Sequence, residues 1–96
     1  MTHAIKVLDA LEAVGLISDI KRHRDTNGVT TFNASGRLMC SSGNYGGRSY
    51  LSFIAQEEID IIFAVHVLRN LGLHPSQKPK AVDVQVKYFK GLQDRA

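Results

Sequence analysis

The pair Asn27–Gly28 is the sequence feature that most constrains how this chain folds. Both residues tolerate the positive φ angles of a two-residue hairpin turn, and β-forming residues lie on either side of them. We therefore predict antiparallel strands at about 17–25 and 29–34. A two-residue turn also fixes which side chains share a face of the hairpin. One face would carry Lys21, His23, Thr30 and Phe32, and the other Ile20, Arg22, Arg24, Val29 and Thr31.

The remaining pattern predicts a chain order of α-β-β-β-β-α-β. Helical spacing of apolar residues alternates with stretches of period two, and glycine or proline separates them. The economical packing is an α+β two-layer sandwich, in which a mostly antiparallel sheet of about five strands has two helices on one face. The 96 residues, of which 44% are hydrophobic, predict a single domain over 1–96. Beyond the first hairpin, the predicted elements are helix 3–14, strands 37–42 and 48–54, helix 56–71, a linker-like loop at 74–80 and strand 81–90.

A glycine-rich stretch, S-G-N-Y-G-G-R-S at 42–49, is close to a phosphate-binding loop. Such a loop leads directly into a helix N-terminus, whereas this stretch leads into the β-prone run YLSFIA, and its first glycine is missing. We interpret it as a hairpin with a flexible five-residue loop at 43–47. Tyr45 and Arg48, at the tip of that loop, are residue types enriched in binding hot spots.

The basic run from Lys21 to Arg24 is the most informative local feature. Neither face of its hairpin is apolar enough to be fully buried, so its end should project from the sheet or form an edge. Four consecutive basic positions favour contact with phosphates or an acidic protein surface. The alternative is protection of an edge strand against aggregation, which also uses charge. For the second basic set, a solvated surface is the simpler interpretation; it consists of Lys78, Lys80, Lys87 and Lys90.

Helix 56–71 is more apolar than one covered face requires. One stripe consists of Ile61, Ala64, Val65, Leu68 and Leu71. A second stripe consists of Ile59, Ile62, Phe63 and Val67. We expect helix 3–14 to cover the second stripe, and the alternative is a symmetric homodimer through helix 56–71.

Residues that could carry chemistry are sparse. Cys40 with a histidine is the one conceivable nucleophile–base pair, but the four histidines are scattered, and packing of a buried thiol is the expected role. No metal-ligand or catalytic spacing occurs, so we predict no catalytic residue, metal or cofactor. No apolar run approaches the length of a membrane span, and a lone cysteine fits a reducing compartment, so a cytoplasmic location is expected.

These features predict a small non-catalytic binding protein with a formal charge of +3. Its basic β-hairpin would engage nucleic acid or a nucleic-acid-processing protein. The alternative is a protein–protein inhibitor or adaptor of viral or mobile-element type that blocks a host complex. An enzyme that uses the 43–49 loop or Cys40 is a third hypothesis. The candidate partner-binding residues are Lys21, Arg22, His23, Arg24, Phe32, Tyr45 and Arg48.

Overall fold

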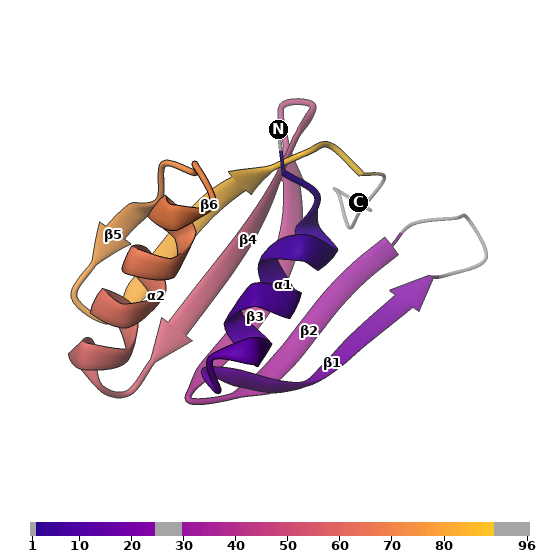
Figure 1. Ribbon diagram of the computed structural model, residues 1–96. Coiled ribbons are helices and arrows are strands. Elements are labelled where there is room, and N and C mark those ends of the chain that lie inside the picture. Colours follow the sequence, from indigo (N-terminus) through magenta and orange to yellow (C-terminus); the bar gives the residue numbers. More distant parts are fainter. Residues whose placement is uncertain (1, 25–29, 90–96) are drawn as a thin grey trace.

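The computed structural model describes residues 2–24 and 30–89 of the chain. Two helices and a six-stranded antiparallel sheet form an α+β structure, which confirms the predicted fold class (Figure 1). The sheet has one strand more than predicted, because three residues of the expected loop at 74–80 pair with the last strand. The elements are α1 (Ala4–Ala13), β1 (Ile17–Arg24), β2 (Thr30–Gly36), β3 (Leu38–Tyr45), β4 (Arg48–Ala55), α2 (Glu58–Asn70), β5 (Ser76–Lys78) and β6 (Ala81–Val86).

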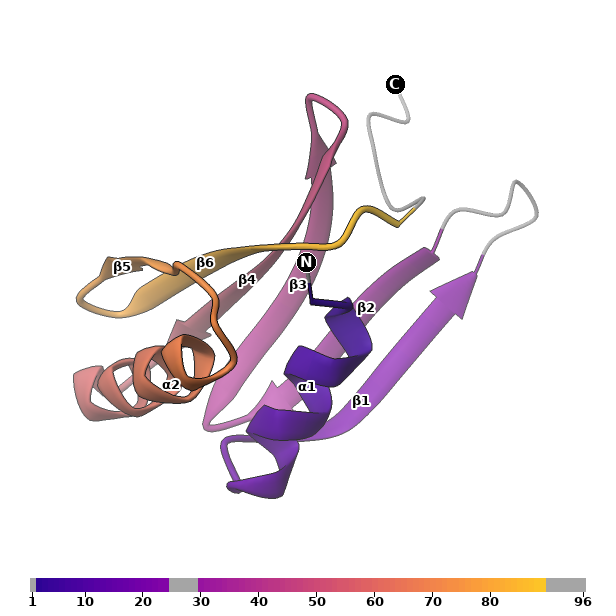
Figure 2. The same cartoon turned by 45° about the horizontal axis from the view of Figure 1, so that its top comes forward.

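The sheet has the strand order β1-β2-β3-β4-β6-β5, and every neighbouring pair is antiparallel. Both helices lie on one face of it, with α1 over the β1–β3 side and α2 over the β4–β6 side (Figures 1 and 2). We call the opposite face, which neither α1 nor α2 covers, the open face. Within the described residues, neither helix is both long enough and apolar enough to cross a bilayer.

The core lies between the helices and the sheet, and it follows from period-two alternation in the strands. Alternate residues of β4 and β6 are buried, while their neighbours face the open side. Each helix adds a single apolar stripe, as an amphipathic helix does when it covers one face of a sheet. The largest fully buried side chains are Phe53, Leu8, Leu11, Leu16, Leu38, Leu51, Ile61 and Leu68, with Val7, Val82, Val84 and Val86.

The end of β2 packs closely against the start of β1 at Gly36. The φ angle of Gly36 is +134°, and a Cβ at this position would lie 3.1 Å from both the Ile17 Cα and the Leu16 carbonyl oxygen. The Leu38 amide donates to the same Leu16 oxygen at 3.0 Å. Because all these neighbours are backbone atoms, only glycine fits at this position without displacing a strand.

The β3–β4 hairpin differs from the prediction. The expected five-residue loop at 43–47 is a two-residue turn, Gly46–Gly47, with φ angles of +57° and +77°. Gly43 lies within β3, opposite Tyr50, and Tyr45 pairs directly with Arg48. A Gly-Gly pair favours this short turn, because both central positions need positive φ.

The register of the β1–β2 hairpin also differs from the prediction. Arg22 pairs with Phe32 and Arg24 with Thr30, which is one residue away from the register that a two-residue turn at Asn27–Gly28 requires. The Asn27–Gly28 turn itself lies outside the described residues. Because of this one-residue difference, Phe32 lies directly opposite Arg22 in the register and shares its face of the hairpin. The prediction had placed Phe32 on the face of Lys21 and His23.

The last strand is shorter than the predicted 81–90. It ends at Val86, after which the Lys87 amide donates to the Thr2 carbonyl oxygen. The chain is held further along by Ser49, which is fully buried and whose Oγ accepts from the Phe89 amide at 2.9 Å. The Asn44 Nδ2 donates to the Phe89 carbonyl oxygen at 2.9 Å. Side chains of β3 and β4 therefore fix the segment that follows β6.

Candidate functional site

The basic residues lie on an edge of the sheet, as the sequence predicts. Strand β1 is the first strand in the sheet order, and Lys21, Arg22 and His23 are exposed. The side chains of Arg24 and Phe32 lie outside the described part of the structure. Beyond the pairing of Ala34 with Cys40, the β1–β2 hairpin diverges from the rest of the sheet (Figures 1 and 2). We call residues 21–24 of this hairpin the basic arm.

A β-bulge decides which face the basic arm presents. The register shifts by one residue between Ser18 and Lys21, and Asp19 within the bulge has a positive φ of 52°. The extra residue lets Ile17 and Ile20, three positions apart, both contact the core. It also brings Lys21 opposite Asn33, one position before the buried Ala34. Lys21 and His23 therefore occupy open-face register positions, and Arg22 occupies a helix-side position.

Two aromatic residues extend the open face at the same end of the sheet. Tyr45 is 82% exposed and pairs with Arg48 beside the Gly46–Gly47 turn. Tyr50 is half-buried and pairs with Gly43, which has no side chain. A hollow of about 490 Å³ lies here; it is lined by Ser41, Ser42, Gly43, Asn44, Tyr45, Tyr50, Ser52, Ser76 and Asp83.

Charge is distributed unevenly along the strands. The basic arm and Arg48 lie at the end of the sheet where β1 is followed by β2 and β3 by β4 (Figure 1). Lys78 and Lys80 flank the β5–β6 turn, and Arg37 lies in the β2–β3 turn at the opposite end. Four of the described carboxylates also lie toward that opposite end, so they are distant from the basic arm; they are Glu12, Glu57, Glu58 and Asp60. Asp19 lies in β1 itself, two residues before Lys21.

Cys40 has the buried packing role that the sequence predicts. Its Sγ lies 3.6 Å from the Ser41 carbonyl oxygen, and burial raises the pKa of the thiol from 9.0 to about 12. A thiolate is therefore scarce at neutral pH, and the thiol is a poor nucleophile. Within residues 2–24 and 30–89, no group of three or more His, Cys, Asp or Glu side chains is arranged to hold a metal ion.

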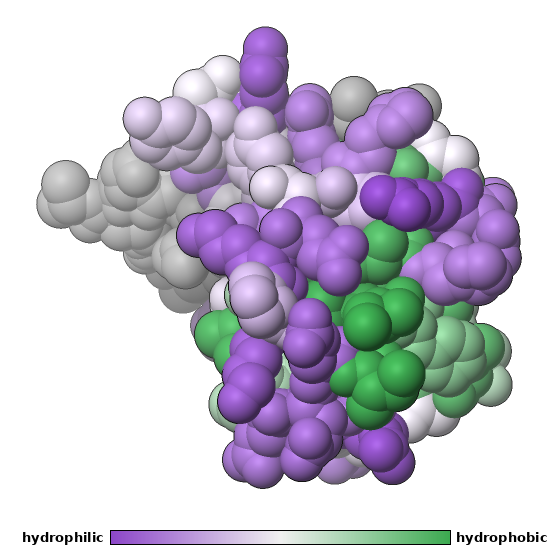
Figure 3. Space-filling model, turned by 90° about the vertical axis from the view of Figure 1, so that its left-hand side faces the viewer, coloured by the Kyte–Doolittle hydropathy of each residue, from purple (hydrophilic) through white to green (hydrophobic). Residues whose placement is uncertain are grey.

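A second candidate surface lies on α2. The predicted core stripe is buried at Ile61, Ala64, Val65 and Leu68. The expectation that α1 covers the other stripe is wrong, because Ile59, Ile62 and Phe63 are 61%, 49% and 43% exposed. Seen from the α2–β5 side, the molecule shows a continuous apolar area bordered by hydrophilic residues (Figure 3). We call Ile59, Ile62 and Phe63 the α2 patch.

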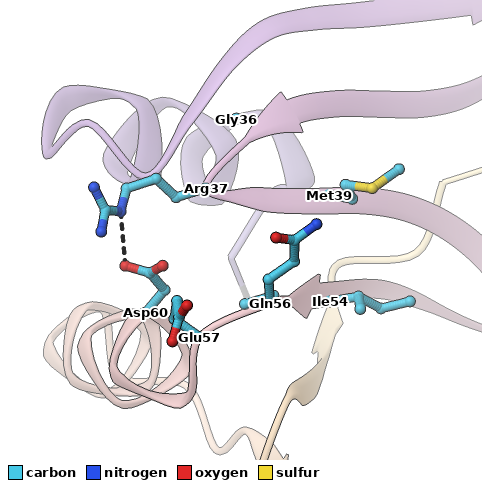
Figure 4. A pocket seen from close by; sticks show the side chains of 8 residues that line it. Gly36, Arg37, Met39, Ile54, Gln56, Glu57 and Asp60 are labelled. Carbon is cyan, nitrogen blue, oxygen red and sulfur yellow. Dashed lines mark hydrogen bonds and ion pairs between the residues drawn. The ribbon is translucent and has the colours of Figure 1, made fainter.

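A pocket of about 290 Å³ opens at the end of the sheet farthest from the basic arm. Met39 and Ile54, opposite each other on β3 and β4, form its apolar side (Figure 4). Arg37 and Asp60 form its polar side, with 2.8 Å between Arg37 Nε and Asp60 Oδ1. Asp60 is buried in the first turn of α2, so the ion pair ties that helix to the β2–β3 turn.

The structure brings some candidate residues together and adds others. Lys21 and His23 share the open face with Tyr45 and Arg48, whereas Arg22 occupies the helix side. Tyr50 was missed by the sequence reasoning, although its place in the alternating run 48–54 could have assigned it to the face of Arg48. No family model, curated protein or solved structure compared with this chain matches it.

Proposed function

We propose that this chain is a small binding protein, without chemistry of its own, that holds single-stranded nucleic acid on its open face. One observation carries the proposal: Lys21 and His23 share a sheet face with Tyr45, Arg48 and Tyr50. Cationic side chains and accessible aromatic rings on one surface are what a single strand requires, because its backbone is anionic and its bases are unstacked.

Electrostatics supports a polyanionic partner. The cations of the basic arm and Arg48 belong to two hairpins that end at the same end of the sheet. Four carboxylates lie toward the opposite end, so they weaken the local positive potential little at distances beyond a Debye length of about 8 Å. Asp19, two residues before Lys21, offsets part of the charge of the basic arm, in which Lys21, Arg22 and Arg24 still leave a net positive charge. Phosphate contacts of this kind supply affinity that depends on salt and not on sequence.

The aromatic residues favour a single strand over a duplex. Tyr45 is exposed, and Tyr50 borders the hollow of about 490 Å³. Bases reach such rings only when they are unstacked, which is the normal state in single strands and costs energy in a duplex. Asp83, in the same hollow, would repel a phosphate but can accept a hydrogen bond from the amino group of a base.

The spacing of the hairpins sets the length of the site. β1 and β4 are three strand intervals apart, which corresponds to about 14 Å in a regular sheet, and the diverging arm lengthens this distance. A span of that size covers about four nucleotides at the step of about 3.4 Å of a stacked strand, and fewer in an unstacked strand, whose step is longer. An oligonucleotide of about ten residues is therefore long enough to contact both hairpins at once.

The proposal is tested by fluorescence anisotropy with labelled single- and double-stranded oligonucleotides of the same sequence. Wild type is expected to bind the single strand more tightly. The variant Lys21→Ala/Arg48→Ala is expected to bind at least about tenfold more weakly. The matched control, Lys78→Ala/Lys80→Ala, loses the same charge from exposed positions at the β5–β6 turn and should bind like wild type.

A second pair of variants separates stacking from charge. Tyr45→Ala should weaken single-strand binding about fivefold or more, because each stacked base contributes about 1–3 kcal/mol. Its matched control is Tyr88→Ala, which removes a different exposed tyrosine, one that follows β6. The proposal is refuted if Lys21→Ala/Arg48→Ala and its control Lys78→Ala/Lys80→Ala weaken binding equally. It is also refuted if wild type does not bind at low salt. Either result would point to a protein partner instead.

A further inference from the structure

The α2 patch is the strongest feature that the proposed function does not use. Ile59, Ile62 and Phe63 are large, apolar and exposed, and all three lie on α2. With His66 they occur at positions i, i+3, i+4 and i+7, so they form one continuous stripe along α2. Isolated exposed apolar residues are ordinary, but a continuous stripe of this kind marks an interaction surface.

The apolar surface continues beyond the helix. A hollow of about 510 Å³ lies between the end of α1 and the first turns of α2. Ile59 and Phe63 form one wall of it, and Val14, which is also exposed, contributes on the α1 side. The surface therefore combines a ridge with an adjacent depression, which is the shape that one helix needs to pack against another.

The charges that flank the stripe are complementary to those of a second copy. Glu58 is in the first turn of α2 and Arg69 is in the last turn, and both are exposed. In an antiparallel pair with its two-fold axis at the level of Ala64, Glu58 lies six residues before the axis and Arg69 five residues after it. At about 1.5 Å per residue, Glu58 comes within about 1.5 Å along the axis of the partner's Arg69.

The same charges argue against a parallel arrangement. Parallel helices would bring Glu58 beside its own copy and Arg69 beside its own copy, and both contacts repel. The antiparallel arrangement also opposes the two helix dipoles, which is favourable. It places Ile62 opposite the partner's His66, so the apolar stripe is covered along its length.

We propose that this chain forms a symmetric homodimer in which the α2 patches of two copies pack antiparallel. The contact is isologous, as in most dimers. Each copy contributes few large apolar side chains, so the interface is at the small end of the range, and we expect a dissociation constant of micromolar order. The two sheets lie outside the helices, so both open faces remain accessible. The inference does not depend on the proposed nucleic-acid binding.

Sedimentation equilibrium from low micromolar to millimolar protein, without nucleic acid, measures the dimer directly. Wild type should show a reversible monomer–dimer equilibrium. Ile62→Ser should raise the dissociation constant about tenfold or more, because it removes a buried apolar side chain from both sides of the contact. The matched control is Ile54→Ser, which changes another exposed isoleucine on the open face and should leave the equilibrium unchanged.

The orientation is tested by charge exchange. Glu58→Arg and Arg69→Glu should each weaken the dimer, and the double variant should restore it, because only an antiparallel pair brings the two positions together. Circular dichroism confirms that each variant is folded. A monomeric wild type at millimolar concentration would overturn the inference and leave the α2 patch to a different protein. A dimer insensitive to Ile62→Ser, or not restored by the double exchange, would overturn it as well.

Discussion

Replacement of Gly36 by alanine should destabilise the protein more than replacement of any described glycine at which an added Cβ would meet open space. The new Cβ would lie 3.1–3.2 Å from three backbone atoms of residues 16–18, and these atoms cannot rotate away. Overpacking of this kind costs about 1–3 kcal/mol. The φ of +134° adds about 1–2 kcal/mol for a residue with a side chain. We expect a loss of about 2–5 kcal/mol in the free energy of unfolding.

Gly15→Ala is the matched control. Gly15 also has a positive φ, +80°, but a Cβ there would meet nothing within 4 Å. Its replacement should therefore cost only about 1 kcal/mol, from backbone strain alone. The difference between the two variants isolates the steric term at Gly36.

Urea denaturation followed by circular dichroism measures both free energies. A chain of this length has a total stability of about 5–14 kcal/mol, so the Gly36 variant should lose a large fraction of it. Each kcal/mol corresponds to a fall of about 4–8 °C in Tm. If Gly36→Ala cost no more than Gly15→Ala, the close packing of the β2–β3 turn against the start of β1 would be refuted.

Three further predictions concern contacts elsewhere in the fold. Ser49→Ala should cost about 1–3 kcal/mol, because it leaves the Phe89 amide without its buried acceptor. The Cys40 thiol should resist labelling in the native protein at pH 8. Because its folded-state pKa is raised from 9.0 to about 12, stability should fall as pH rises above 9, by at most about 1.4 kcal/mol per pH unit. Arg37→Ala should cost about 1 kcal/mol, because it removes the partner of the buried Asp60, although the exposed arginine is screened by water.

Each of these variants has a control. Ser52→Ala changes a half-exposed serine on the same strand and should be nearly neutral, as should Lys80→Ala at an exposed position. Cys40→Ala should abolish the part of the stability loss above pH 9 that the thiol causes. If the free energies of unfolding of wild type and Cys40→Ala fell in parallel above pH 9, the raised pKa would be contradicted. Rapid native labelling of Cys40 would contradict its burial.

The sequence patterns predicted the elements well, because alternation and helical spacing are local signals. Helix 56–71 and the second hairpin lie close to their predicted positions. The short strand β5 was missed, since three polar residues between prolines carry no local strand signal, and their pairing with β6 is a tertiary effect.

The faces of the first hairpin were harder to predict, because register depends on single residues. Ile17 and Ile20 both face the core, and their odd spacing requires a bulge that a strict alternation cannot describe. The pair Asn27–Gly28 suggested a two-residue connection, whereas the pairing of Arg24 with Thr30 is one residue out of the register that such a turn requires. A one-residue difference exchanges the faces of the cross-strand partners, so Phe32 was assigned to the wrong side.

The second stripe of α2 shows a different limit. Its apolar character was visible in the sequence, but which element covers it depends on where α1 crosses the sheet. The structure places α1 over the β1–β3 side, which leaves Ile59, Ile62 and Phe63 exposed. Helical periodicity identifies an apolar surface and cannot identify what packs on it.

The most direct measurement is the salt dependence of single-strand binding by wild type and by Lys21→Ala/Arg48→Ala. Between about 50 and 200 mM salt, the logarithm of the binding constant should fall linearly, with a slope of about −0.7 for each phosphate contact. The double variant should reduce the magnitude of that slope by about 1.4, whereas Lys78→Ala/Lys80→Ala should leave it unchanged. A slope that is the same in all three proteins would contradict a phosphate-binding role for the basic arm and Arg48.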